Sequence, residues 1–277
     1  MGWGLGTWGL GIWGLGTWGL GTWGLGIWGL GIYLLRTANY KLFIIITLIM
    51  VKKKLILSLG GSLIIPQDKI AINFLKKFRV LILKFLKNGY QIVIVTGGGG
   101  INRHYNQQAQ KINLIKNQDL DWLGIACSKL NAEFLRLIFS PFAYEKVVAN
   151  PETKLKGQPK LIIGSGWQPG CSTDKQAVMW AQKLKADLVV NLTDIDYVYD
   201  QDPDKYKNAQ PIKKIRWPDF LKIIGEKWSP RTSTPFGPPA SKLAQQLGIK
   251  VAVINGKNIK NLENCLKGQN FKGTLIY

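Results

Sequence analysis

The strongest constraint on the fold is a set of short, continuous apolar runs that each end at a glycine-rich turn. The first run, Lys54–Leu59, stops at Gly60-Gly61-Ser62, and the next, Gln91–Thr96, stops at four successive glycines. An apolar run of four to eight residues without alternation is typical of a strand that is buried on both faces. Because such strands occur in sheets covered by helices on both sides, the pattern predicts a parallel sheet.

Segments with helical spacing of apolar residues separate these runs. Apolar residues at intervals of three and four predict a helix over residues 70–87, closed by Asn88-Gly89. Further helices are expected at 101–111, 121–139, 174–185, 218–225 and 240–247, and further strands at 147–148, 161–163, 187–192, 250–254 and 273–277. The alternation predicts an α/β fold, a three-layer α/β/α sandwich with a mostly parallel central sheet. Ligands of such folds bind at the carboxyl ends of strands, where the glycine clusters lie.

The composition argues against several kinds of site. His104 is the single histidine, which argues against a His-clustered zinc site and a Ser-His-Asp triad. Cys127, Cys171 and Cys265 lack C-x-x-C spacing, so neither a zinc ribbon nor a disulfide framework is expected. These cysteines fit a reducing compartment, and we expect a cytoplasmic protein.

Residues 1–49 follow a different pattern. Residues 1–32 repeat Trp-Gly-Leu-Gly followed by Thr or Ile, a five-residue period that matches neither helix nor strand. The apolar stretch 42–51 is too short to span a bilayer. We expect residues 1–49 to be unfolded or to precede the true start at Met50, with one domain over 50–277; a functional Trp-rich arm is the alternative. Intact mass of the native protein tests this start, and a detected Trp-Gly peptide would contradict it.

The chain is strongly basic, with a net charge of +21. Residues 1–49 contribute only Arg36 and Lys41 to it, which leaves +19 for residues 50–277. Such a charge suggests an anionic partner, such as nucleic acid, a membrane surface or a phosphorylated small molecule. The lysines are scattered, and no aromatic-basic motif of an RNA-binding sheet occurs. We therefore expect neither a nucleic-acid nor a membrane partner.

Three glycine turns, at 60–62, 97–100 and 164–170, are candidates for phosphate binding. Glycine lets backbone N–H groups approach a phosphate closely, with a helix N-terminus behind them. None of these turns is a Walker A loop, and the sixth residue counted from Gly97 is Asn102, which excludes the dinucleotide fingerprint. Three such turns at strand ends favour phosphate binding over simple strand closure.

Seven short motifs follow one another in unbroken order. They are Leu-Gly-Gly-Ser at 59–62, Thr-Gly-Gly-Gly at 96–99 with Arg103, Asp121 with Gly124-Ile125 and Asn131, Gln-Pro-Gly-x-Ser-Thr-Asp at 168–174, Ala-Asp-Leu-Val-Val at 186–190, Thr-Asp-x-Asp-x-Val-Tyr at 193–199 with Asp202-Pro203, and Pro239-Ala-x-Lys242. From about Leu55 to Tyr277 the chain resembles the amino acid kinase superfamily, and within it the archaeal-type uridylate kinases. The resemblance implies ATP-dependent phosphorylation of UMP to UDP with Mg²⁺, in pyrimidine nucleotide biosynthesis, and a homo-oligomer, typically a hexamer.

The resemblance also implies a site for each substrate. The positions that match the ATP side are Gly61, Ser62, Gly99, Arg103, Thr193, Asp194, Tyr199 and Asp202. The positions that match the UMP side are Gly98, Asp121, Trp167, Gln168, Pro169, Gly170, Cys171, Ser172 and Thr173. Asp174, Lys242 and Arg103 are the expected catalytic residues, and no protein ligand to a metal is expected. The attacking phosphate oxygen is already anionic, so catalysis needs positioning and charge neutralisation rather than a strong base.

Other interpretations of the same residues stay open. Asp121 and Asp174 are also placed to cap the helices that they begin. Arg103 and Lys242 are also compatible with ordinary solvated side chains.

Three departures from the family pattern favour a second hypothesis, a catalytically weak nucleotide- or oxyanion-binding protein on the same fold. Ser58 stands where many members have Lys, Tyr197 where Gly is usual, and Gly237 where Asp often precedes the proline. A third hypothesis is another small-molecule kinase of the superfamily. Its isopentenyl phosphate branch has a catalytic His four residues after the glycines; here Arg103 holds that place, and His104 is turned away by about 100° of helix.

Overall fold

A seven-stranded sheet forms the centre of the computed structural model, which describes residues 53–66, 69–203, 205–225 and 234–277. The tryptophan-glycine repeat, the apolar stretch at 42–51 and the expected start at Met50 lie outside the described residues. None of the helices in the described ranges is long and apolar enough to cross a membrane.

The strand order of the sheet places the ends of distant segments side by side. In spatial order the strands are β3 (Leu161–Gly164), β2 (Gln91–Thr96), β1 (Lys54–Leu59), β4 (Leu188–Thr193), β8 (Lys250–Asn255), β9 (Thr274–Ile276) and β7 (Lys214–Ile215). The first five run parallel, and β9 is antiparallel to β8. The two short strands β5 (Val198–Tyr199) and β6 (Pro211–Ile212) form a separate antiparallel pair. The expected mostly parallel sheet is confirmed.

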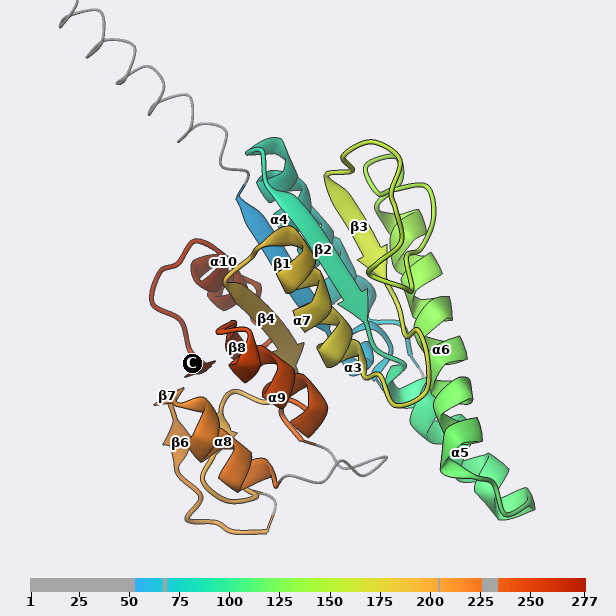
Figure 1. Ribbon diagram of the computed structural model, residues 1–277, viewed down its shortest axis with the longest axis vertical. Helices are drawn as coiled ribbons and strands as arrows, with labels where there is room; N and C mark the ends of the chain where they lie inside the picture. Colours follow the sequence, from blue (N-terminus) through green and yellow to red (C-terminus); the bar gives the residue numbers. More distant parts are fainter. Residues whose placement is uncertain (1–52, 67–68, 204, 226–233) are drawn as a thin grey trace, which may run out of the picture. The chain divides into compact units, whose positions relative to one another are not determined.

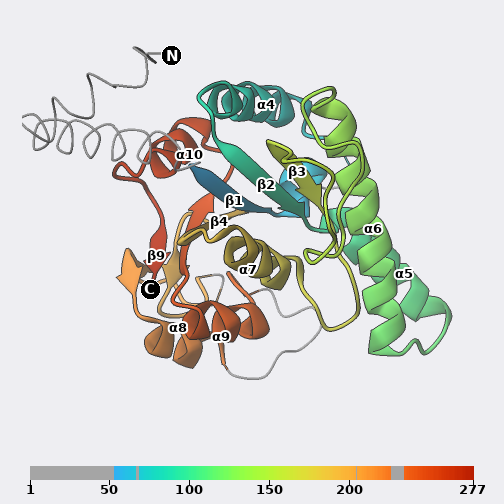
Figure 2. The same ribbon diagram turned by 45° about the horizontal axis from the view of Figure 1, so that its top comes forward.

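Helices cover both faces of the sheet (Figures 1 and 2). One face packs against α3 (Gly61–Ile64), α4 (Ile72–Lys87), α6 (Asn117–Ile138) and α10 (Ile259–Leu266), and the other against α7 (Thr173–Leu184), α8 (Trp217–Ile224) and α9 (Pro238–Gln246). Successive strand residues alternate between the two cores, since Ile56 packs on the α7 side and Leu57 on the α4 side. The strands are apolar throughout because both of their faces are buried.

Several details differ from the pattern-based expectation. The helix α6 begins at Asn117 with Lys116 as its N-cap, so Asp121 does not cap it. Val148 makes only an isolated parallel bridge to Gly164, so residues 147–148 do not form a strand. The helix α5 (Gly99–Ile112) packs on α6 rather than on the sheet, and Asn106 is its one buried residue. The apolar residues of α5 are too few to cover a sheet face, which explains why its partner is another helix.

The sheet order reverses direction between β1 and β4. From β1 the chain moves through β2 to β3 on one side, whereas β4 and β8 lie on the other side. The N–H of Gly60, just after β1, donates to the carbonyl of Leu192 in β4 at 2.9 Å. Such a reversal opens a crevice at the carboxyl ends of the strands, the usual ligand position in open α/β sheets. The glycine turns after β1, β2 and β3 all lie at this end.

Candidate active site

The first two glycine turns pack directly against each other. A Cβ atom at Gly61 would lie 2.5 Å from the carbonyl oxygen of Gly97, and one at Gly99 would lie 2.5 Å from the carbonyl carbon of Gly61. Gly99 also has φ +69°, a backbone conformation that residues other than glycine rarely adopt. Only glycine therefore allows the turn after β1, expected to contact ATP, to touch the turn after β2, in which Gly98 is matched to UMP and Gly99 to ATP.

Two polar residues of α6 anchor the second and third turns. Asn131 Nδ2 donates to the carbonyls of Gly97 at 2.8 Å and Gly98 at 3.3 Å. Ser128 Oγ donates to the carbonyl of Thr96 at 2.8 Å and accepts from the N–H of Gly166 at 2.7 Å. Because both α6 side chains are buried, these bonds satisfy backbone groups that water does not reach.

A cavity of about 530 Å³ opens beside these turns, between α5, α6 and the loop that precedes α7. Eight of the expected site residues line it: Gly98, Arg103, Asp121, Gln168, Gly170, Cys171, Ser172 and Thr173. Trp167 and Pro169 belong to the same loop but do not line the cavity. Seven of the nine expected UMP residues thus converge on one cavity, although they come from three separate segments. Arg103, matched to the ATP side, also faces this cavity.

The cavity offers complementary groups to a phosphorylated ligand. Ser172 caps the N-terminus of α7, and its hydroxyl accepts from the N–H of Lys175 at 3.2 Å. Helix N-termini favour anions, and Arg103 adds a positive charge from α5. Asp121 accepts from the N–H of Gly170 at 3.2 Å and so links α6 to the loop. A phosphate is therefore favoured at the Ser172 end of the cavity.

Asp174 is held beneath the turns by two donors. The hydroxyl of Ser58, on β1, donates to Asp174 Oδ1 at 2.8 Å, and the N–H of Gly237 also bonds the carboxyl group. Burial raises the pKa of Asp174, while the hydrogen bonds from Ser58 and Gly237 lower it by less. Asp174 thereby joins β1, α7 and the residue before α9.

The expected ATP residues beyond the glycine turns lie at the end of β4 and in the segment that follows it. Thr193 ends β4, and its hydroxyl accepts from the N–H of Ile195 at 3.1 Å. Tyr199 lies on β5, and the exposed Asp202 pairs with Lys205 at 3.4 Å. Asp194 is exposed, as is Lys242 on the first turns of α9. None of these five expected residues lines the cavity.

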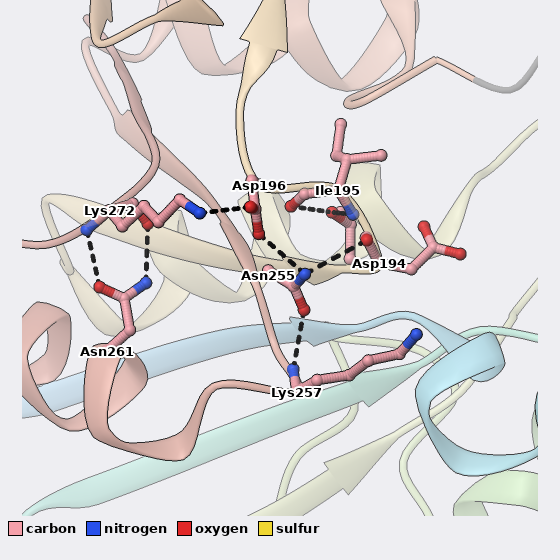
Figure 3. Close-up of polar contacts among 8 residues, drawn as sticks. Asp194, Ile195, Asp196, Asn255, Lys257, Asn261 and Lys272 are labelled. Carbon is pink, nitrogen blue, oxygen red and sulfur yellow. Dashed lines mark hydrogen bonds and ion pairs between the residues drawn. The ribbon is translucent and has the colours of Figure 1, made fainter. Parts of the chain in front are cut away.

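A polar network folds the loop after β4 (Figure 3). Asn255, at the end of β8, donates to Asp196 Oδ1 at 2.9 Å, and Lys272 forms an ion pair with the same carboxylate. The hydrogen bond from Lys272 is the main cause that lowers the pKa of Asp196. Asn261 on α10 exchanges two hydrogen bonds of 2.7 Å with the backbone of Lys272. The network ties the loop to β8, α10 and the segment before β9.

Comparison with known proteins identifies the family of this chain. The sequence model of the amino acid kinase family matches residues 53–255. The chain belongs to the amino acid kinase family. A uridylate kinase from Sulfolobus acidocaldarius is 32% identical over 227 residues, which cover 80% of this chain and 98% of that relative. A uridylate kinase from Pyrococcus abyssi is 31% identical over 226 residues, which cover 80% of this chain and 99% of that relative.

A solved structure agrees with this sequence similarity. The crystal structure of uridylate kinase from Archaeoglobus fulgidus matches with a TM-score of 0.68 at 27% identity, covering 81% of this chain and 100% of that one. The expected family and the expected three-layer fold are thus confirmed.

The three departures from the amino acid kinase pattern have local structural explanations. Ser58 replaces a charged group with a hydroxyl that bonds Asp174, and Gly237 supplies its N–H to the same carboxyl group. Tyr197 turns its ring toward Lys272, whose Nζ lies 6.0 Å from the ring centre. His104 is exposed and does not line the cavity. Each departure is therefore accommodated by contacts that the pattern alone does not reveal.

Sequence reasoning missed several polar residues that line the cavity. Ser128, Asn102 and Asn106 all line the cavity, and Ser128 and Asn106 are buried. A signal was present for Ser128, because a polar residue on the apolar face of a helix often bonds backbone in the core. No comparable signal marked the two asparagines, since α5 is polar on most of its surface.

Proposed function

We propose that this chain is a uridylate kinase that transfers the γ-phosphoryl group of ATP to the phosphate of UMP. The observation that carries the proposal is the direct packing of Gly61 against Gly97 and Gly99, beside a cavity lined by most of the residues expected to bind UMP. Two phosphate turns in contact bring a donor and an acceptor phosphate within reach of each other. The names of the relatives from Sulfolobus and Pyrococcus support this substrate.

The acceptor phosphate lies, in this proposal, between the N-terminus of α7 and Arg103. Ser172 and Thr173 donate hydroxyl hydrogen bonds, and the helix N-terminus and the guanidinium group neutralise charge. Asp121 accepts from hydroxyls of the uridine moiety. Since the acceptor oxygen is already anionic, no residue has to remove a proton from it.

ATP binds, in this proposal, across the ends of β1 and β4. The turn Gly61-Ser62 contacts its phosphates, while Thr193, Asp194 and Tyr199 contact its nucleoside part. Lys242, on the first turns of α9, supplies a further positive charge to the transferring phosphates. This arrangement places donor and acceptor on opposite sides of the touching glycine turns.

Mg²⁺ is proposed to arrive with ATP. Among the described residues, no group of three or more His, Cys, Asp or Glu side chains is placed to hold an ion. One nearby carboxylate, Asp174, fits an ion held chiefly by nucleotide phosphates and water, which is the usual state of Mg²⁺ in kinases. Such an ion neutralises phosphate charge, and Asp174 contributes by orienting the groups around the phosphates.

Assembly and location are further parts of the proposal. Leu130 and Leu137 of α6 are each 61% exposed, which supports a homo-oligomer. Light scattering of the purified protein measures that state. All three cysteines are free thiols, which supports a cytoplasmic location.

The function is tested by ADP release with ATP, Mg²⁺ and a panel of acceptors: UMP, CMP, dTMP, AMP and isopentenyl phosphate. We expect turnover with UMP that exceeds turnover with each of the other acceptors. Turnover with isopentenyl phosphate instead would assign the chain to another branch of the family. ATP binding without turnover on any acceptor would favour a binding protein.

A further inference from the structure

Asn106 is a polar side chain buried in the wall of the cavity. It lies on α5, is 8% exposed, and its Oδ1 atom has no hydrogen-bond partner among the described residues. Leaving a buried acceptor unpaired is costly, so such an atom in a cavity wall indicates a ligand that donates a hydrogen bond. None of the motifs that led to the proposed function includes this residue.

The packing of α5 against α6 fixes the level of Asn106 in the cavity. The two helices pack together as an antiparallel pair joined by residues 113–116, and a Cβ at Gly124 would lie 3.1 Å from Asn102 Nδ2. Asn106 lies one turn after Asn102 on α5, and Asp121 lies about one turn before Gly124 on α6. Asn106 and Asp121 are therefore at the same level on the two helices, and both line the cavity.

This level is farther from the glycine turns than the residues that are proposed to bind the acceptor phosphate. Arg103 lies only one helical turn from Gly99, and Ser172 lies at the N-terminus of α7. A nucleoside monophosphate with its phosphate at those residues therefore presents its nucleoside to Asn106 and Asp121. A carboxylate only accepts hydrogen bonds, and the unpaired atom of Asn106 also accepts. The neighbouring 2′ and 3′ hydroxyls of ribose are two donors that match these two acceptors.

We propose that Asn106 accepts a hydrogen bond from one ribose hydroxyl of the acceptor nucleotide, opposite Asp121, and so selects ribonucleotides over deoxyribonucleotides. The proposal rests on UMP being the acceptor. A site that hydrogen-bonds a hydroxyl discriminates strongly against an analogue that lacks it, because the buried acceptor is then left unpaired. Asn106 is thus a specificity-determining residue for the sugar.

The test compares kcat/KM for UMP, 2′-deoxy-UMP, 3′-deoxy-UMP and CMP in the full-length protein and in Asn106→Leu. The wild-type protein should prefer UMP over one of the two deoxy analogues by at least about tenfold. Asn106→Leu should lose most of that preference and keep the ratio of UMP to CMP. Gln108→Leu is the matched control, because Gln108 is exposed on the same helix and does not line the cavity. It should behave like the wild type with all four nucleotides.

Several results would overturn the proposal. An equal loss of kcat/KM with all four nucleotides in Asn106→Leu would indicate that the amide has only a structural role. A change confined to the ratio of UMP to CMP would indicate that Asn106 contacts the base. A wild-type protein without preference for either hydroxyl would also refute it. Asn106→Ala applies the same comparison if Asn106→Leu does not fold. Asn106→Asp keeps an acceptor oxygen and should retain the preference.

A binding measurement separates this inference from the proposed function. Calorimetric titration with UMP and with the two deoxy analogues, without ATP, gives the same preference independently of turnover. Absence of turnover, together with a binding preference that Asn106→Leu removes, would refute the kinase activity and leave the sugar selection supported. Turnover of UMP without any such preference would support the kinase activity and refute the sugar selection.

Discussion

Single residues decide how closely the first two glycine turns can approach each other. Gly61 and Gly99 have no room for a side chain, because each hypothetical Cβ meets the backbone of the other turn. Ser58 departs from the family pattern, and its hydroxyl donates a hydrogen bond to the carboxyl group of Asp174. The site therefore depends on the absence of a side chain at Gly61 and Gly99 and on the absence of a charge at Ser58.

Gly61→Ala should reduce turnover of UMP by at least about a hundredfold, because the methyl group would push the two turns apart and reacting groups tolerate little misplacement. Steady-state kinetics with UMP and ATP measures the loss. Gly89→Ala is the control: Gly89 also resists substitution, with φ +82°, but its surroundings are open. It should cost about 1–2 kcal/mol of stability and leave turnover within about twofold. Near-normal turnover in Gly61→Ala would show that the contact between the two glycine turns is not required for the reaction.

Asp174→Asn should alter the pH dependence of stability. Burial raises the pKa of Asp174, so the folded protein holds this proton at pH values where the unfolded chain, with a pKa of about 3.9, has released it. The wild type therefore loses stability relative to Asp174→Asn as pH rises from about 4 toward neutrality. Urea denaturation at several pH values measures the difference between the two free energies of unfolding. A variant that becomes less stable than the wild type as pH rises would contradict the direction of the shift.

At the scale of elements, α6 and the loop after β4 organise the two halves of the site. Ser128 and Asn131 of α6 form hydrogen bonds with the turns after β2 and β3, which shapes the cavity proposed to bind the acceptor. The loop after β4 is held by Asn255 and Lys272, which come from the far end of the chain. Each substrate side is therefore supported by a different set of elements, and the two should be separable by mutation.

Lys272→Met should weaken ATP binding and leave UMP binding unchanged. The variant removes the ion pair with Asp196 and loosens the loop expected to contact the ATP nucleoside. Because the pair is partly exposed, we expect only about a two- to fivefold rise in the KM for ATP. Lys267→Met is the control, since Lys267, the residue after α10, pairs with Glu263 of that helix rather than with Asp196. A rise in the KM for UMP instead would mean that the network supports the acceptor side.

At the scale of the whole molecule, the order of strands creates the site. The direction of the sheet reverses between β1 and β4, and the glycine turns gather at the carboxyl ends next to that reversal. Residues 53–277 form one compact unit by their contacts, and the family model begins at residue 53. The parts required for the proposed reaction therefore all lie in this unit.

A chain truncated to residues 50–277 should turn over UMP with a kcat/KM within about twofold of the full chain. The reason is that every expected site residue and both hydrophobic cores lie beyond residue 53. The ADP-release assay compares the two proteins, and urea denaturation checks that the truncated chain is folded. A large loss of turnover in a folded truncated chain would show that residues 1–49 take part in function.

The sequence alone determined the elements, the fold class and the edge of the sheet that carries the site. Apolar runs identify buried strands and glycines mark their ends, because these signals are local and depend on residues that are neighbours in the chain. The order of seven motifs indicated the family. The two-residue strands β5, β6 and β7 were not expected, since such short strands leave no periodic pattern.

Only the tertiary structure decided which distant groups meet. Ser58 and Asp174 are 116 residues apart, and their bond depends on α7 lying across β1. Asn106 is unremarkable in the sequence of a polar helix, and it becomes a candidate only because α5 packs on α6 and buries it in the cavity wall. Contacts of this kind follow from strand order and helix direction, which a local pattern of residues does not encode.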